Sequence, residues 1–243
     1  MKNNEFNEVA DEYLFNDSLF EEVIMSSSIW GFTHPYQVIT EIGKTIAFHD
    51  PKRFISIMKL FPEPSEEDAN SYMLFYSGQL YKELGKSYVQ VEGKTSDNAS
   101  RAFDTSRIFY GKISTSNQYH LIQISELYIQ IGILDIALDT LEKVPIRERS
   151  TCFWHHRYSQ ILYGKLKYEP ALTEIDEALR LTKESEEKYK SAFLFQKGKV
   201  LAKFRDYVGA IVTLREAFRL SDDKKFKSLI EQEIACLSAT DPC

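Results

Sequence analysis

The segment Tyr168–Leu181 reads YEPALTEIDEALRL, and the segment Tyr207–Leu220 reads YVGAIVTLREAFRL. In both, a tyrosine is followed at the same offsets by an alanine, an aliphatic residue, a second alanine and a leucine. A third copy, Leu134–Leu141, reads LDIALDTL and is followed by Pro145. The first alanines of the three copies are Ala137, Ala171 and Ala210. They are 34 and 39 residues apart, which indicates stacked copies of one supersecondary unit.

A small residue also precedes each of the three copies, where a partner helix is expected, and another lies on an earlier helix of the same kind. Two helices approach closely only where at least one of them carries Ala, Gly or Ser at the crossing. The small residues on the expected partner helices are Gly78, Ser125, Ser159 and Gly198. A period near 34 with this pattern is typical of tetratricopeptide repeats. The sequence therefore predicts an all-α fold, a tetratricopeptide-repeat right-handed superhelix of antiparallel helix pairs.

Four parts are expected along the chain. They are an acidic N-terminal arm or helix over residues 1–30, a degenerate first helix pair over 31–65, four tetratricopeptide-type repeats over 66–222, and a C-terminal capping helix over 223–243. The helix pairs expected within the repeats are 68–84 with 97–112, 117–131 with 134–143, 151–165 with 168–182, and 185–204 with 207–221. In helix 97–112, either Ala99 or Ala102 can hold the crossing position. The polar stretch Gly85–Asn98 is predicted to be a loop.

Both ends of the array are expected to differ from the regular repeats. The first pair is predicted at Tyr36–Phe48 and Pro51–Phe61, because proline suits a helix start and Pro62–Pro64 would end the pair. The last helix is predicted to start at an aspartate cap, Asp222 or Asp223. Its expected apolar face is Phe226, Leu229, Ile230, Ile234 and Leu237. A half-polar helix of this kind would cover the end of the array.

Composition and charge narrow the kinds of partner. The chain has 43% hydrophobic residues but only 10 glycines and 7 prolines among 243, which favours long helices over turn-rich folds. Its net charge is -6, and the segment Met1–Ile24 alone carries seven acids against one base. The remainder is neutral, so we expect no nucleic-acid binding. The acidic segment, with its interleaved aromatic residues, is either a solvated helix or an arm that docks on a partner.

The chain is expected to be intracellular, in the nucleus, the cytoplasm or both. Its apolar runs are far shorter than the about 20 residues of a membrane span, so no membrane association is expected. It starts without the basic and apolar regions of a signal peptide. Its three cysteines show no paired spacing, which indicates a reducing compartment.

One stretch has side chains capable of chemistry, namely Cys152, His155 and His156. At helical spacing two of them could touch one metal ion, but no second pair is available to complete four ligands. A Cys–His nucleophile would need an oxyanion hole and an orienting residue, and no pattern indicates either. The alternative is a repeat helix with His155 and Tyr158 packed inward and His156 on the concave face. We therefore expect no enzyme, metal, cofactor or small-molecule substrate.

The concave face is the expected binding surface. Inward positions on successive first helices of the pairs are Phe75, Gln79, Ile122, Glu126, His156, Gln160, Tyr163, Phe195 and Lys199. They lack the set of lysines and asparagines with which some repeat proteins clamp the carboxylate of a chaperone tail. A mostly apolar helix or strand fits the predicted face better.

The turn Pro145-Ile-Arg147-Glu-Arg149-Ser-Thr151 follows a shortened second helix. It resembles the N-terminal repeat region of subunit seven of the anaphase-promoting complex, which has an aliphatic–Pro turn with the same spaced arginines and a following threonine. The resemblance extends over Leu121–Ile131 and Phe153–Arg180, and more loosely back to Tyr36. The chain departs from this family in its short Gly111–Asn117 connection, and it is a fragment, a reduced homologue or a relative with another role.

The resemblance implies a non-catalytic structural subunit of a cell-cycle ubiquitin ligase. Its N-terminal repeats would form a homodimer, and the other repeat subunits of the large assembly would be its protein partners. A stand-alone adaptor that binds a peptide or helix in its groove is the alternative from the residues themselves, and an enzyme using Cys152 is the third.

Overall fold

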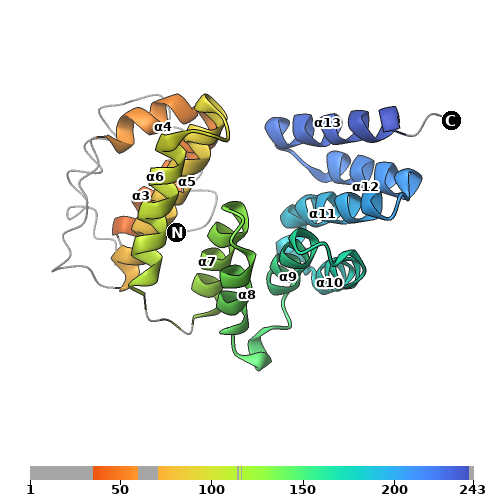
Figure 1. Ribbon diagram of the computed structural model, residues 1–243, viewed down its shortest axis with the longest axis horizontal. Helices are drawn as coiled ribbons and strands as arrows, with labels where there is room; N and C mark the ends of the chain where they lie inside the picture. Colours follow the sequence, from red (N-terminus) through yellow and green to blue (C-terminus); the bar gives the residue numbers. More distant parts are fainter. Residues whose placement is uncertain (1–34, 60–70, 114, 116, 241–243) are drawn as a thin grey trace. The chain divides into compact units, whose positions relative to one another are not determined.

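The computed structural model describes residues 35–59, 71–113, 115 and 117–240 (Figure 1). The predicted acidic arm over 1–30 therefore lies outside the described residues, as do 60–65 at the end of the predicted first pair. The chain divides between Thr115 and Ser116 into two compact units. All described regular elements are helices, as the sequence predicts. None of the described helices combines the length and the apolar character needed to cross a bilayer.

The first unit contains α3 (Pro35–His49), α4 (Pro51–Met58), α5 (Ser71–Glu92) and α6 (Asp97–Gly111). Helix α4 starts as predicted at Pro51, and the Asp50 carboxylate accepts a hydrogen bond from the Arg53 amide at 3.0 Å. Helices α3 and α4 both pack on α5. Their shared core includes Ile42, Phe54 and Leu80, all at most 2% exposed.

Helix α5 is longer than predicted. The expected loop over Gly85–Asn98 is wrong, because the helix continues through Gly85 to Glu92 and only Gly93–Ser96 separates it from α6. A glycine in a helix interior is unfavourable. At Gly85, however, a Cβ would lie only 2.5 Å from the ring of Phe103 on α6. The missing side chain lets this ring cover α5. Packing between the helices therefore outweighs the local preference.

The crossing between α5 and α6 uses a residue that the repeat pattern did not identify. Ser106 on α6 donates a hydrogen bond to the carbonyl oxygen of Gly78 at 2.7 Å. Both predicted alternatives, Ala99 and Ala102, are buried, at 2% and 4% exposure. The close approach is thus distributed along α6 instead of depending on one alanine.

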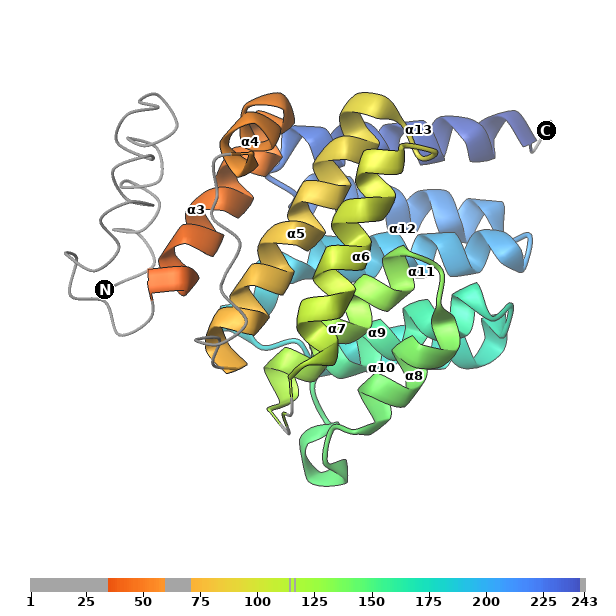
Figure 2. The ribbon, with the colours of Figure 1, turned by 60° about the vertical axis from the view of Figure 1, so that its left-hand side comes forward.

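The second unit contains the regular repeats (Figures 1 and 2). Its elements are α7 (Gln118–Gln130), α8 (Leu134–Glu142), the 3-10 turn η1 (Ile146–Glu148), α9 (Cys152–Gly164), α10 (Tyr168–Leu181), η2 (Glu184–Tyr189), α11 (Lys190–Lys203), α12 (Tyr207–Leu220) and α13 (Lys224–Thr240). The pairs α7–α8, α9–α10 and α11–α12 match the predicted pairs, and both views show α11, α12 and α13 side by side.

Small residues mark the crossings of these pairs, as predicted. Ala137, Ala171 and Ala210 are completely buried. Ser159 on α9 donates to the carbonyl oxygen of Ala171 on α10 at 2.8 Å. A Cβ on Gly198 would lie 2.7 Å from Leu214. The backbones therefore approach too closely for larger side chains at these positions.

Two details of the second unit differ from prediction. The helix expected over 185–204 is α-helical only from Lys190, because the preceding segment forms the 3-10 turn η2. There the Glu186 carboxylate accepts from the Lys183 amide at 3.2 Å, which stabilises the tighter turn. In α13, Asp223 is the cap, with its carboxylate accepting from the Phe226 amide at 3.1 Å. Leu229 is 46% exposed and lies off the buried face formed by Ile230 and Leu237.

Candidate functional site

The turn after α8 is held by an arginine that caps the shortened helix. Pro145 cannot continue the helix, so the last carbonyl groups of α8 need other donors. The Arg149 guanidinium donates to the carbonyl oxygen of Glu142, the last residue of α8, at 2.5 Å, and to that of Val144, just after the helix, at 2.8 Å. It also lies 5.7 Å from the ring centroid of Trp154. A cation at the C-terminal end of a helix also interacts favourably with the helix dipole.

The neighbouring residues of the turn divide into anchored and exposed ones. The Thr151 hydroxyl accepts from the Trp154 amide and caps α9, and it accepts from the Gln118 side chain on α7 at 2.9 Å. Ile146 is 80% exposed, and the Arg147 side chain is 85% exposed. The turn is therefore anchored at Thr151, and its tip presents the apolar Ile146 and the cationic Arg147, whose guanidinium lies 3.5 Å from the Glu148 carboxylate.

Substituting Arg149→Ala is expected to lower the free energy of unfolding by about 1.5–3 kcal/mol, because hydrogen bonds to a charged group are lost and carbonyl groups lose their donors. Urea unfolding followed by circular dichroism measures the change. The matched control Arg147→Ala removes an exposed arginine from the same turn and should change stability by less than about 0.5 kcal/mol. Equal effects of the two substitutions would contradict the capping role of Arg149.

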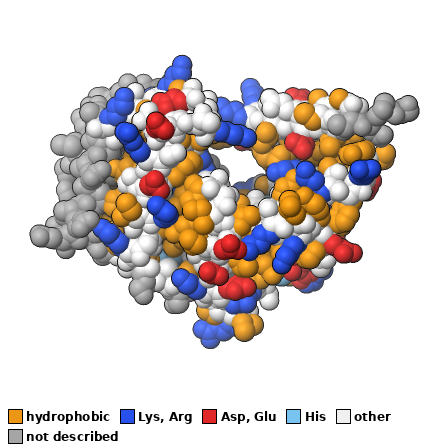
Figure 3. Space-filling model, in the orientation of Figure 1, with side chains coloured by type: hydrophobic (Ala, Val, Ile, Leu, Met, Phe, Trp, Pro, Cys, Tyr) orange, Lys and Arg blue, Asp and Glu red, His pale blue; other side chains and the backbone are white. Residues whose placement is uncertain are grey.

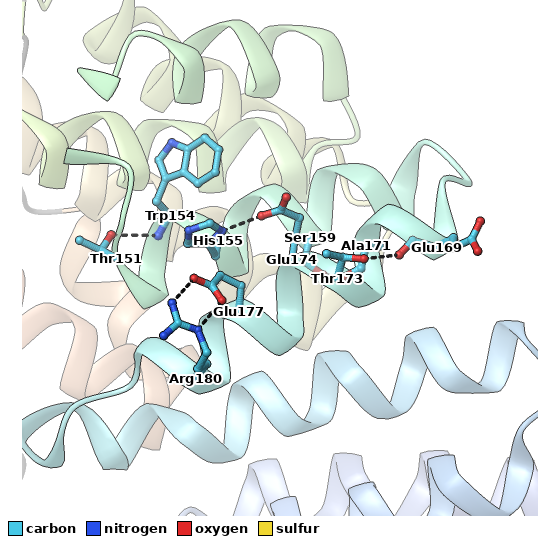
Figure 4. A network of polar contacts seen from close by, with 10 residues as sticks. All are labelled: Thr151, Trp154, His155, Ser159, Glu169, Ala171, Thr173, Glu174, Glu177 and Arg180. Atoms are coloured by element: carbon cyan, nitrogen blue, oxygen red, sulfur yellow. Dashed lines mark hydrogen bonds and ion pairs between the residues drawn. The ribbon is translucent and has the colours of Figure 1, made fainter. Parts of the chain in front are cut away.

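Cys152, His155 and His156, the three side chains capable of chemistry, have separate structural roles. His155 Nδ1 donates to the Glu174 carboxylate on α10 at 2.6 Å, and Figure 4 shows the two side chains facing each other. The Cys152 thiol is 1% exposed and donates to Glu186 at 3.4 Å. His156 packs against Phe193 on α11, with ring centroids 4.7 Å apart. Among the described residues, no group of three His, Cys, Asp or Glu side chains could hold a metal ion.

The Cys152 thiol has a raised pKa, whereas a nucleophilic cysteine has a lowered one. Burial raises the pKa of its thiol to about 12, and the Glu186 carboxylate contributes to the same shift. The thiolate is the reactive form, so we expect Cys152 in the folded chain to be alkylated by iodoacetamide at pH 8 more slowly than free cysteine. Mass spectrometry of Cys152 peptides over time measures this rate. A rate above that of free cysteine would favour the enzyme hypothesis.

His156 is buried instead of lying on the concave face. It is 7% exposed, and its Nε2 atom has no hydrogen-bond partner among the described residues. Burial holds its pKa well below the usual 6.5, the charge of Arg157 lowers it further, and Glu126 on α7 opposes the shift. The imidazole is therefore neutral and acts as an aromatic core side chain against Phe193.

The lowered pKa of His156 predicts a loss of stability in mild acid. In the unfolded chain the imidazole binds a proton below about pH 6.5, whereas the folded state excludes it until a much lower pH. Stability is thus complete above about 6.5 and falls below it by up to about 1.4 kcal/mol per pH unit. Urea unfolding at pH 7.5 and 5.5 measures the change. The His156→Gln variant should lose less stability than the native chain between these pH values. An equal loss would contradict the role of His156 in this pH dependence. Burial also lowers the pKa of His120, so both chains should share a smaller loss from that residue.

The nine predicted surface residues separate into buried and accessible groups. Phe75 and Gln79 are completely buried in the first unit, and Ile122 and His156 are 6% and 7% exposed in the second. Those four side chains belong to the packing. The half-buried ones are Glu126, Gln160, Tyr163, Phe195 and Lys199, all in the second unit.

Glu126 and Gln160 form a polar network with a residue that the prediction missed. Arg157 on α9 makes an ion pair with Glu126 on α7 at 3.1 Å and donates to Gln160 at 2.9 Å. Both charged side chains are only 16–17% exposed. The network therefore joins α7 to α9 and leaves little free charge for a partner.

Tyr163, Phe195 and Lys199 meet in an aromatic–lysine cluster. The Lys199 ammonium lies 5.1 Å from the Tyr163 ring centroid and 5.8 Å from that of Phe195. The Lys203 ammonium lies 5.9 Å from the Tyr163 ring. Phe226 on α13 packs edge-on against Phe195 at 5.2 Å. These five residues, which we call the aromatic–lysine cluster, come from α9, α11 and α13.

Two members of the cluster were not predicted as site residues. Lys203 is one helical turn after Lys199 and shares its face, so the spacing of four residues was the available signal. Phe226 was assigned to the covering face of the last helix. Its contact with Phe195 depends on how α13 packs, which no local pattern reports.

The arrangement of paired helices with small residues at each crossing defines a tetratricopeptide-type helical repeat protein. No protein-family profile matches the sequence, and no curated protein is similar to it. Among solved structures, the whole chain is similar to a chain in the crystal structure of the APC/C hetero-tetramer Cut9–Hcn1, with a TM-score of 0.55 and 14% identity. The match covers 100% of this chain but 41% of the other, so this chain spans about two fifths of its length.

Two further solved structures have lower TM-scores. MamA AMB-1 has a TM-score of 0.41 at 14% identity, covering 74% of this chain and 95% of that one. Yeast Tom70 has a TM-score of 0.32 at 12% identity, covering 98% and 58%. At these identities the likeness concerns the fold alone.

Proposed function

We propose that this protein is a non-catalytic scaffold that joins other proteins through its helical repeats, as a structural subunit of an assembly of the anaphase-promoting-complex type. The observation that carries the proposal is the similarity of the entire chain to part of an APC/C subunit structure. The chain corresponds to 41% of that structure's chain, so partners and assembly are inferred by analogy.

The turn at Pro145–Thr151 supports the proposal independently of the overall fold. The residues that resemble subunit seven of that complex form a capped turn, in which Arg149 and Thr151 are anchored. The exposed Ile146 and Arg147 at its tip are accessible to a neighbouring protein. The turn thus combines anchored residues with an exposed tip, which suits a subunit that stacks on others.

The proposal includes a homodimer formed through the N-terminal region, with other repeat subunits as further partners, in the nucleus or cytoplasm. Sedimentation equilibrium of the full chain tests the homodimer. The 28.2 kDa chain should sediment with twice that mass at high concentration. A monomer at every concentration would exclude self-association but not the scaffold role.

Affinity purification of the tagged full chain from its source cells tests the assembly. Subunits of a ubiquitin ligase should be recovered with it. The double substitution Ile146→Ser with Arg147→Glu changes only the exposed tip and should reduce this recovery, whereas the double substitution Val208→Ser with Val212→Ser, at exposed positions of α12, serves as the matched control. Recovery without any ubiquitin-ligase subunit would overturn the assignment to this assembly.

The aromatic–lysine cluster favours a second candidate, a stand-alone adaptor that binds a peptide or helix. Half-buried aromatic and lysine side chains are suited to anchoring a partner segment. A chain that remains monomeric, co-purifies with no other subunit and binds one short peptide at the cluster would favour the adaptor.

A further inference from the structure

The aromatic–lysine cluster contains two cations that have no carboxylate partner within the part of the chain that the structure describes. In the same unit, Lys165, Lys197 and Arg157 each form an ion pair with an acidic side chain. No ion pair joins Lys199 or Lys203 to any described residue. Glu233 on α13 is near enough to affect Lys199, and yet it does not pair with it. The cluster therefore has excess positive charge, and its Lys199 is partly buried.

The environment of Lys199 indicates what kind of group is missing. An ammonium group has three hydrogen-bond donors. Lys199 lies against the ring faces of Tyr163 and Phe195, and the Tyr163 hydroxyl hydrogen-bonds with Lys203. Burial lowers the pKa of Lys199, Glu233 raises it and Lys203 lowers it. A carboxylate placed beside Lys199 would accept its hydrogen bonds and favour its charged form.

The rings specify a second property of the occupant. Phe195 and Phe226 are both partly exposed and present a ring pair beside the two lysines. Figure 3 shows hydrophobic and basic side chains next to each other over α11–α13. An occupant that brings acidic groups together with large apolar side chains would match both features.

One segment of this chain has that composition. Residues 5–23 contain seven acids and no base, with eight large apolar residues interleaved. The acids are Glu5, Glu8, Asp11, Glu12, Asp17, Glu21 and Glu22, and the apolar residues are Phe6, Val9, Tyr13, Leu14, Phe15, Leu19, Phe20 and Val23. Residues 25–243 have no net charge, so this segment carries the acidic imbalance of the chain.

We propose that residues 5–23 of a second copy of this chain dock on the aromatic–lysine cluster, with their carboxylates on Lys199 and Lys203 and their aromatic side chains on Phe195 and Phe226. This inference rests on the proposed homodimer and names the contact that forms it. In a two-fold dimer the contact occurs twice, so two modest contacts reinforce each other.

Photo-cross-linking of the full chain tests the occupant directly. The chain carries p-benzoylphenylalanine in place of Phe226, and equal amounts of unlabelled and 15N-labelled protein are mixed before irradiation. Mass spectrometry should find residue 226 of one copy joined to a peptide within residues 5–23 of the other, with mixed isotope composition. Cross-links only within one molecule, cross-links to another segment, or none at all would overturn the proposal.

Charge reversal tests the chemistry of the contact. The double substitution Lys199→Glu with Lys203→Glu should reduce the mixed cross-link about tenfold, since each exposed charge contact contributes modestly and both become repulsive. The matched control, Lys224→Glu with Lys225→Glu, changes two exposed lysines of α13 and should leave the cross-link unchanged. A second copy that carries Glu8→Lys, Asp11→Lys and Glu12→Lys should cross-link to the Lys199→Glu, Lys203→Glu variant. It should cross-link poorly to a copy with the native lysines.

The outcomes separate this inference from the proposed function. A chain that still sediments as a dimer but gives no cross-link to residues 5–23 refutes only the docking contact. A monomer at every concentration refutes the homodimer and the docking contact together, and co-purification with ligase subunits remains a separate test. If the reversed variant does not fold, the cross-link in the chain with native lysines still decides the proposal.

Discussion

Replacing Trp154 by alanine is expected to lower the free energy of unfolding by about 3–5 kcal/mol, one of the two largest effects of a single substitution considered. Trp154 is 8% exposed, and its indole Nε1 donates to the carbonyl oxygen of Leu141 on α8 at 3.2 Å. Its ring also packs against Tyr158 at 5.0 Å and lies beneath Arg149. The substitution therefore removes core volume and the donor that joins α9 to the end of α8.

Urea unfolding followed by far-ultraviolet circular dichroism measures this loss, because the substitution removes one of only two tryptophans and so alters the fluorescence. Trp154→Phe serves as the matched control, since it keeps an aromatic ring but loses the N–H donor, and it should have a smaller effect. The double variant with Arg149→Ala should lose less than the sum of the single losses, because the two residues contact each other. Additive losses would show that Arg149 acts independently of the tryptophan.

The substitution Phe193→Ala is also expected to lower the free energy of unfolding by about 3–5 kcal/mol at pH 7.5. Phe193 is 1% exposed and lies between His156 and Phe153, with ring centroids 4.7 and 6.2 Å away. Removing the ring opens space beside the His156 imidazole, so water can reach it and its pKa should return toward 6.5. The variant should then lose less additional stability than the native chain between pH 7.5 and 5.5.

Urea titrations at the two pH values test both parts of this prediction. Phe204→Ala, at a 45% exposed phenylalanine directly after the same helix, is the matched control and should cost less than about 1 kcal/mol with no change in pH dependence. A Phe193→Ala variant with the pH dependence of the native chain would show that this ring does not exclude the proton from His156.

Helix pairing was predictable because close packing requires small residues at fixed intervals. Ala137, Ala171 and Ala210 repeat in the sequence, and each is fully buried at a helix crossing. The helix starts at Pro51 and after Asp223 were also predictable, since proline and aspartate act on the backbone within a few residues. Such signals are local, and they require no knowledge of which helices become neighbours.

The candidate site was predicted less completely. Helical spacing selected Tyr163, Phe195 and Lys199, and these three side chains meet in the cluster. The same spacing selected His156, which is buried. Periodicity reports the direction of a side chain around its helix but not how much of another helix covers it.

The sequence by itself determined an all-helical repeat protein, the positions of its closest helix crossings and the concentration of acid in residues 1–24, because these depend on residue size, spacing and charge. Only the tertiary structure decided that α5 runs through Gly85, that Arg149 caps α8 and that Phe226 packs against Phe195. Each of these depends on a contact between separate elements, whose energy outweighs the local preferences that a sequence pattern records.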